Sequence, residues 1–195
     1  MSLITKVKAG GVSSLSDARF FAGMGVDWIG FDVNPLSEAY VSVEQYRSFV
    51  GWIAGPKRVL ELPPGFAPDT LPTLLNEYIP DYLEVALSDV GKITTDHPLF
   101  ARTSSSTIPI DTVLERVDYV VLHVDTDPIN LKELVQGIAK KSKVLLHVAP
   151  DYKNIKTVIE TLPISGISLQ GSKESQTGIK VYDYADLLES IEAED

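Results

Sequence analysis

The sequence of 195 residues contains no cysteine, which excludes disulfide bonds and thiolate chemistry. It also contains no apolar run near the ~20 residues that cross a bilayer. Its first residues include Lys6 and Lys8, where a signal peptide would have an uninterrupted apolar segment. These absences predict a cytoplasmic protein with no membrane partner.

Positive charge is scarce, with 17 Lys and Arg residues against 27 Asp and Glu residues and a net charge of −10. Because nucleic-acid phosphates are bound mainly by Lys and Arg, the composition argues against a nucleic-acid partner. A small anionic ligand is still allowed, since a local group of backbone N–H donors suffices to bind it. The length and the 44% apolar content predict one globular domain over residues 1–195.

The sequence does contain a regular alternation of short β-type apolar runs and amphipathic stretches. The expected strands are Ile4–Ala9, Asp27–Val33, Lys57–Leu62, Asp81–Leu87, Pro98–Thr103, Asp118–Val124, Lys143–Val148 and Gly166–Leu169. The expected helices are Leu15–Met24, Val43–Ala54, Asp69–Glu77, Asp111–Arg116, Leu131–Lys140, Tyr152–Thr161 and Tyr184–Glu192, with at most one helical turn over Asp89–Thr95. Eight such units predict parallel strands, and fitting them into so short a chain favours a single closed (β/α)8 TIM barrel over an open doubly wound sheet.

Two segments carry specific motifs. From Val7 to Ser42 the chain contains VKAGGVSSLSDA, GVDWIGF and PLSEAYVS, and from Ser168 to Lys180 it contains SLQGSKESQTGIK. They resemble, without a gap, motifs of the phosphoribosylanthranilate isomerase family, which read approximately VKICGITxxEDA, GADAxGF, PxSxRxVS and DVSSGVExxPGxK. The resemblance implies a barrel for the Amadori aldose–ketose isomerisation of N-(5-phosphoribosyl)anthranilate in tryptophan biosynthesis. It further implies a sugar-phosphate or other metabolite as ligand, no cofactor, and a monomer or homodimer.

The sequence departs from this family at positions that carry its chemistry. The family's general base, a cysteine, corresponds to Gly10, and its substrate-contacting arginine corresponds to Ala39. The two glycines that bring a phosphate against backbone N–H groups after the seventh strand correspond to Val148 and Ala149. Loss of the base and of the phosphate anchor predicts that isomerase activity is weak or lost. The alternative is a non-catalytic or repurposed barrel that binds a metabolite.

The family's general acid, an aspartate at the end of the sixth strand, has two possible counterparts. Asp125 is the candidate general acid, but a register shift of two residues places His123 there instead. His123, His147 and Asp125 are also residue types that bind Zn²⁺ or Fe²⁺. No His-x-x-x-His spacing supports a metal site, so none is expected.

Nearly every expected strand carries a polar side chain inside its apolar run. These residues are Lys8, Asp32, Glu61, Glu84, Arg102, His123 with Asp125, His147 and Ser168. They either face the helices or solvent at strand ends, or they converge on the C-terminal mouth where such barrels bind ligands. If they converge, a remodelled polar pocket is expected, with Lys8, Glu84, Arg102, His147 and Ser168 in contact with substrate.

Gly171 and Ser172 follow the last strand and form a pair of small residues. Their N–H groups are candidates for binding an anion, as the family's small residues do at this place. The other interpretation is a tight turn that requires glycine for its backbone conformation.

Overall fold

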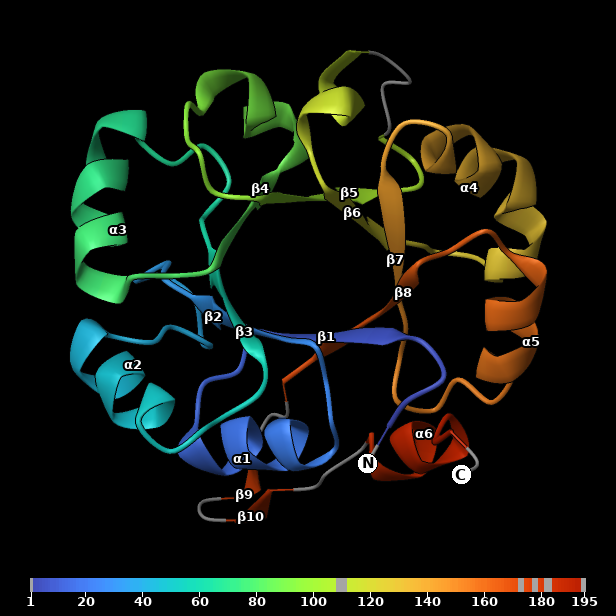
Figure 1. Ribbon diagram of the computed structural model, residues 1–195, viewed down its shortest axis with the longest axis horizontal. Helices are drawn as coiled ribbons and strands as arrows, with labels where there is room; N and C mark the ends of the chain where they lie inside the picture. The colour runs from blue at the N-terminus through green and yellow to red at the C-terminus, as the bar shows by residue number, and fades with distance from the viewer. Residues whose placement is uncertain (1, 108–111, 172–173, 177–178, 181–183, 194–195) are drawn as a thin grey trace.

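The chain forms a closed barrel of eight parallel strands surrounded by helices in the computed structural model (Figure 1). The structure describes residues 2–107, 112–171, 174–176, 179–180 and 184–193. The barrel strands are β1 (Lys6–Gly10), β2 (Trp28–Asp32), β3 (Lys57–Glu61), β4 (Tyr82–Ala86), β5 (Leu99–Ser104), β6 (Tyr119–His123), β7 (Lys143–His147) and β8 (Gly166–Gln170). They pair in sequence order, and β8 pairs with β1 to close the barrel. The predicted (β/α)8 fold is confirmed.

The outer layer is less regular than expected. Its α-helices are α1 (Leu15–Gly23), α2 (Val43–Val50), α3 (Leu71–Tyr78), α4 (Lys132–Ala139), α5 (Ile155–Thr161) and α6 (Ala185–Ser190). Short 3₁₀ helices occupy η1 (Pro68–Thr70), η2 (Leu87–Lys92), η3 (Thr112–Arg116) and η4 (Pro128–Leu131). The helix expected over Asp111–Arg116 is present as a 3₁₀ helix over Thr112–Arg116, and Asp111 lies outside the described residues. So short a segment gains few i→i−4 hydrogen bonds to offset the cost of α-helix nucleation. A small antiparallel pair, β9 (Glu174–Gln176) with β10 (Ile179–Lys180), was not expected.

Local capping sets where the first two helices begin. The Ser14 hydroxyl accepts a hydrogen bond from the Asp17 N–H at 3.2 Å, so Ser14 caps α1. At α2 the Ser42 hydroxyl accepts from the Gln45 N–H, and the Gln45 side chain accepts from the Ser42 N–H. This capping box satisfies two N–H groups that a helix otherwise leaves unpaired.

Aromatic rings fill the end of the barrel where the strands begin. The Trp28 ring lies 5.4 Å from Phe100 and 5.0 Å from Tyr119, measured between centroids, and Phe100 stacks on Tyr119 at 4.8 Å. All three residues stand at or next to the first position of their strands and are buried. The polar side chains that line the cavity described below lie toward the opposite, C-terminal end.

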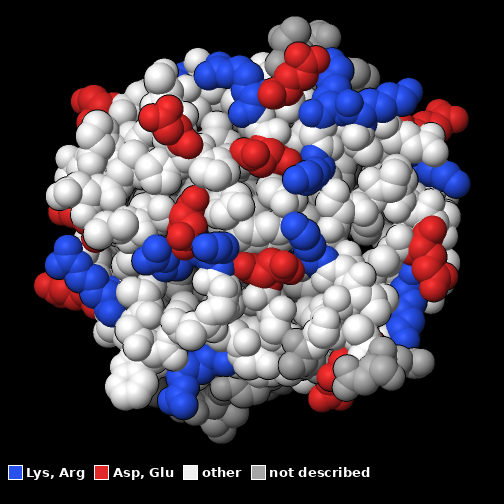
Figure 2. Space-filling view, in the orientation of Figure 1, with Lys and Arg blue, Asp and Glu red and all other residues white. Residues whose placement is uncertain are grey.

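The surface offers no sign of a large region of one charge on the face shown in Figure 2, where acidic and basic side chains are interspersed among uncharged ones. Among the residues that the structure describes, no helix is long and apolar enough to cross a membrane.

Candidate functional site

A cavity of about 280 Å³ lies at the C-terminal ends of the strands, and every strand of the barrel contributes to its wall. Its polar lining comprises Lys8, Asp32, Asn34, Ser37, Glu61, Glu84, Arg102, His123, His147, Ser168 and Gln170. The five side chains expected to contact substrate all belong to this lining, so the barrel brings them together. Their part in binding a ligand stays a prediction.

Strand register explains why these side chains converge. Asp32 pairs with Glu61 and Glu61 with Glu84 along the lateral row that runs from β2 to β4. Next to this row, Lys8 pairs with Ser168 between β8 and β1, and β1 is the neighbour of β2. Residues in register on neighbouring strands point to the same face of a sheet. When one residue of such a row faces the inside of the barrel, its register partners face inward as well.

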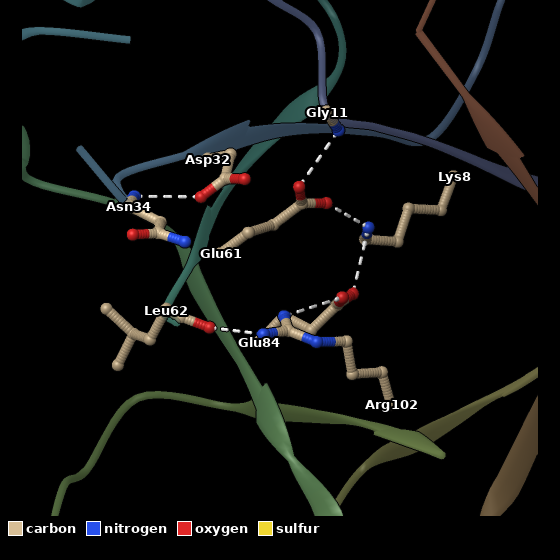
Figure 3. Close-up of polar contacts among 8 residues, drawn as sticks. All are labelled: Lys8, Gly11, Asp32, Asn34, Glu61, Leu62, Glu84 and Arg102. Carbon is tan, nitrogen blue, oxygen red and sulfur yellow. Dashed lines mark hydrogen bonds and ion pairs between the residues drawn. The ribbon is translucent and has the colours of Figure 1, made fainter. Parts of the chain in front are cut away.

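The floor of the cavity is a chain of ionic contacts (Figure 3). The Lys8 Nζ lies 2.5 Å from Glu61 Oε1 and 2.9 Å from Glu84 Oε2. The second oxygen of Glu61 accepts the N–H of Gly11 at 2.9 Å. Arg102 contacts Glu84 Oε1 at 3.4 Å through Nη1 and donates to the Leu62 carbonyl through Nη2. Two cations and two carboxylates thus hold one another in place.

Burial and pairing move the pKa values in this chain in different directions. Burial alone would lower the pKa of Lys8, but Glu61 and Glu84 outweigh it and raise that pKa. Burial raises the pKa of Glu61, and the nearby charge of Glu84 adds to this effect. For Glu84, burial is outweighed by Lys8 and Arg102, which together lower its pKa. Glu61 is therefore the carboxylate that accepts a proton more readily.

Two imidazoles form the wall opposite Glu61 and Glu84. The rings of His123 and His147 stack with centroids 4.1 Å apart and planes inclined by 26°. Burial lowers the pKa of both side chains, and for His147 the neighbouring His123 contributes to a pKa of about 4. Both rings are consequently uncharged at neutral pH, and each offers one N–H donor and one acceptor.

The glycine at position 10, which the sequence resemblance aligns with the family's general base, has a spatial explanation. A Cβ placed on Gly10 would lie 2.7 Å from Glu61 Oε1 and 2.9 Å from Lys8 Nζ. A Cβ on Gly30 would lie 2.0 Å from the same Glu61 oxygen. Glycine at both places leaves room for the Lys8–Glu61 ion pair, and a side chain at either one would collide with it.

The two candidates for the general acid lie in different surroundings. His123, the last residue of β6, lines the cavity. Asp125 follows two residues later, is exposed, and does not belong to the lining. The geometry therefore favours His123 over Asp125 for contact with a ligand, and the catalytic role of either residue stays a prediction.

Two backbone N–H groups near the mouth, one at the candidate anion donor Gly171 and one at Val148, where loss of phosphate binding was expected, are already engaged. The N–H of Gly171 donates to the Gly10 carbonyl at 2.6 Å, and the N–H of Val148 donates to the Ser168 carbonyl at 3.0 Å. Ser172 lies outside the described residues. Gly171 also approaches β1 closely, since a Cβ on it would lie 2.6 Å from the Gly11 carbonyl oxygen. Its glycine is thus required by backbone contact with β1.

Reasoning from sequence noted Glu61 and Asp32 as polar strand residues but gave neither a role. It gave no attention to the N–H of Gly11, which binds Glu61, or to Gln170 at the end of β8. The signal for Glu61 was available: a glutamate at the end of a barrel strand faces the place where such folds bind ligands. The space beside Gly10 and Gly30 that the Glu61 carboxylate occupies can be seen only in the three-dimensional structure.

Comparison with known proteins gives a clear result at the level of structure alone. No protein-family model matches the chain, and no curated protein matches it by sequence. Phosphoribosylanthranilate isomerase from Thermus thermophilus superimposes with a TM-score of 0.74 over 96% of this chain and 100% of its own, at 17% identity. The fold is that of phosphoribosylanthranilate isomerase. The enzyme from Thermotoga maritima gives a TM-score of 0.73 at 18% identity, covering 96% of this chain and 98% of its own.

Another phosphoribosylanthranilate isomerase structure, in complex with reduced 1-(o-carboxyphenylamino)-1-deoxyribulose 5-phosphate, gives a TM-score of 0.73 at 17% identity and covers 96% of this chain and 98% of its own. At these identities the similarity to phosphoribosylanthranilate isomerase establishes the fold, and the activity has to be argued from the residues at the mouth. Among the described residues, no group of three or more His, Asp or Glu side chains is arranged to hold a metal ion.

Proposed function

We propose that this chain is a phosphoribosylanthranilate isomerase-like barrel that binds a small polar metabolite at its mouth and turns over N-(5-phosphoribosyl)anthranilate weakly or not at all. The observation that supports this most directly is the Lys8–Glu61 ion pair in the space beside Gly10. The family places its general base at that position, and here the position carries no titratable group. A place in tryptophan biosynthesis is accordingly not proposed.

The chemistry of the Amadori rearrangement makes this substitution costly. Opening the ribosylamine ring and moving a proton from C2 needs an acid and a base within hydrogen-bond reach, each worth about 10²–10⁴-fold in rate. Glu61 lies nearby, but its two oxygens are held by Lys8 and by the N–H of Gly11. The carboxylate is therefore arranged as an ion-pair partner, and abstracting a proton would require breaking that pair.

Substrate anchoring is altered as well. Ala39 lines the cavity at the position that corresponds to the family's arginine and supplies no charge. The N–H of Val148 is used by the Ser168 carbonyl, so the loop after β7 does not present it to a phosphate. A substrate that carries both a carboxylate and a phosphate would find its usual cationic and backbone donors absent from these positions.

The first test is a direct assay of purified protein with N-(5-phosphoribosyl)anthranilate, in which anthranilate fluorescence monitors the reaction. The second is complementation of a tryptophan auxotroph that lacks the isomerase. We expect no complementation and a kcat/KM at least about 10³-fold below that of an ordinary isomerase assayed beside it, given the loss of one positioned base and of the anchor. A kcat/KM within about tenfold of that isomerase would contradict the proposal.

A second candidate function is acid–base catalysis on a different small sugar. The observation that favours it is the convergence of Glu61 and Glu84 on Lys8 in the cavity, with Nζ–oxygen distances of 2.5 and 2.9 Å. Burial also raises the pKa of Glu61, and carboxyl groups with displaced pKa values are common at sites of proton transfer. Incubating unphosphorylated aldoses with the protein in D₂O tests this: deuterium incorporation at C2 that Glu61→Gln abolishes would favour the enzyme, and its absence across pentoses and hexoses would oppose it.

A further inference from the structure

Three carboxylates stand in one lateral row at the mouth. Asp32 and Glu61 are the last residues of β2 and β3, Glu84 is the central residue of β4, and the three pair in register across these neighbouring strands. The cations in the cavity lining are Lys8 and Arg102, one on either side of the row. With the histidines uncharged, the cavity has three acidic groups for two basic ones, and a row of like charges is unfavourable without a cation for each.

Asp32 differs from the other two carboxylates of the row in its partners. Glu61 is paired with Lys8, and Glu84 is paired with both Lys8 and Arg102. Among the described residues Asp32 takes part in no ion pair; its Oδ1 accepts the N–H of Asn34 at 2.8 Å. The side chain is half-buried and lines the cavity (Figure 3). A partly desolvated carboxylate without a cation attracts a cationic group.

Backbone N–H groups around the mouth favour a cationic ligand over an anion, because several of those in the described loops already donate hydrogen bonds. The N–H of Gly11 binds Glu61, that of Gly171 binds the Gly10 carbonyl, and that of Val148 binds the Ser168 carbonyl. On the loop after β2, the N–H of Ala39 binds the Ser37 hydroxyl. An anion at these places would have to displace an existing hydrogen bond. The favourable binding free energy that a cluster of unpaired N–H groups usually gives an anion is therefore lost.

We propose that the mouth binds a small polyhydroxylated amine, with its ammonium beside Asp32 and its hydroxyls toward the side chains of Asn34, Ser168 and Gln170. The ammonium gives the row of three carboxylates its third cation. The amide and hydroxyl groups donate and accept, which suits a ligand rich in hydroxyls. This inference rests on the proposed metabolite site and names the class of its ligand. That ligand is opposite in charge to the phosphate ester bound in one of the phosphoribosylanthranilate isomerase structures.

The experiment compares three probes that share one carbon skeleton: glucamine, sorbitol and sorbitol 6-phosphate, which are cationic, neutral and anionic near neutral pH. Titration calorimetry gives the Kd values, and the backbone amide NMR shifts of Gly11 and Asn34 locate the binding. We expect glucamine to bind about tenfold or more tighter than sorbitol, and sorbitol 6-phosphate to bind no better than sorbitol. Asp32→Asn keeps an oxygen for the Asn34 N–H but removes the charge, so it should abolish the preference for the amine.

Glu133→Gln is the matched control, because Glu133 is an exposed acidic residue on α4 outside the cavity and its loss should leave the preference unchanged. Tighter binding of sorbitol 6-phosphate than of glucamine, no binding of glucamine at millimolar concentration, or a preference that survives Asp32→Asn would each overturn the inference. None of these outcomes depends on turnover of N-(5-phosphoribosyl)anthranilate. Failure here and failure of the proposed function are therefore separate results.

Discussion

The Lys8 ammonium and the Glu61 carboxylate form a buried ion pair, with Nζ 2.5 Å from Oε1, in the space that a side chain at position 10 would need. Both residues are almost completely buried, so neither charge is solvated by water. A pair of this kind is held by mutual attraction and by further hydrogen bonds, here from the N–H of Gly11. Several measurable consequences follow from that arrangement.

Lys8→Met should destabilise the protein strongly. The substitution keeps the length of the side chain but leaves Glu61 and Glu84 buried without their shared cation, and breaking a buried ion pair costs about 3–5 kcal/mol. Urea unfolding followed by circular dichroism measures the change. Lys132→Met, at an exposed position of α4, should change the free energy of unfolding by less than about 0.5 kcal/mol. A similar small effect of Lys8→Met would mean that the ion pair is not formed in solution.

Gly10→Ala should destabilise the barrel through overpacking, by about 1–3 kcal/mol, because its methyl group meets Glu61 and Lys8. Combining it with Glu61→Ala removes the clash, so the double variant should be more stable than the sum of the single changes predicts, by roughly 0.5–3 kcal/mol. Gly91→Ala is the control, since a Cβ there meets nothing within 4 Å. If the two changes in unfolding free energy were strictly additive in the double variant, the side chain at position 10 would not interact with Glu61.

Gly10→Cys should not restore turnover of N-(5-phosphoribosyl)anthranilate. The thiol returns the residue type of the family's base, but it collides with the Lys8–Glu61 pair, and Ala39 still provides no charge for the substrate. Steady-state kinetics of the variant, set against wild type and an ordinary isomerase, measure this. Recovery to within about tenfold of that isomerase would show that the base alone was missing.

Stability should fall as the pH drops from 6.5 toward 4, in part because of His147. Its folded-state pKa is about 4 against an ordinary value of 6.5, so the unfolded chain binds a proton in this window that the folded protein does not. By linkage, the contribution is fully present above pH 6.5 and is lost as the pH falls, amounting to roughly 3 kcal/mol at 1.36 kcal/mol per pKa unit.

Urea unfolding at a series of pH values compares wild type with His147→Gln, which cannot take up this proton. The variant should show a flatter dependence between pH 6.5 and 4. His97→Gln removes an imidazole from the loop before β5, outside the cavity lining, and should keep the wild-type slope. Equal slopes for wild type and His147→Gln would show that the folded state does not exclude the proton from His147.

The sequence by itself determined the barrel and the end of it where polar side chains gather. Apolar runs of the right length, separated by amphipathic segments, encode eight strand–helix units, because strand and helix periodicity is local in the chain. The polar residues within those runs, such as Arg102 and His147, marked the mouth correctly, since a charge in a strand buried on both faces must be paired or lie at its open end. Sequence periodicity was insufficient to predict the short 3₁₀ helices, because their few hydrogen bonds stabilise them only slightly over loop conformations.

Only the tertiary structure decided which of these polar groups act on one another. Lys8 and Glu61 are 53 residues apart, and their contact depends on barrel closure and strand register, which no local pattern specifies. From the sequence, Gly10 indicated only that a side chain is absent, whereas the fold fills that space with the carboxylate of Glu61. The sequence put Asp125 first as the general acid and His123 second, but Asp125 is exposed beyond the end of β6 while His123 lines the cavity. Contacts across the barrel are made by side chains from strands that are far apart in the sequence. The distances between these side chains are therefore set only once the barrel has closed.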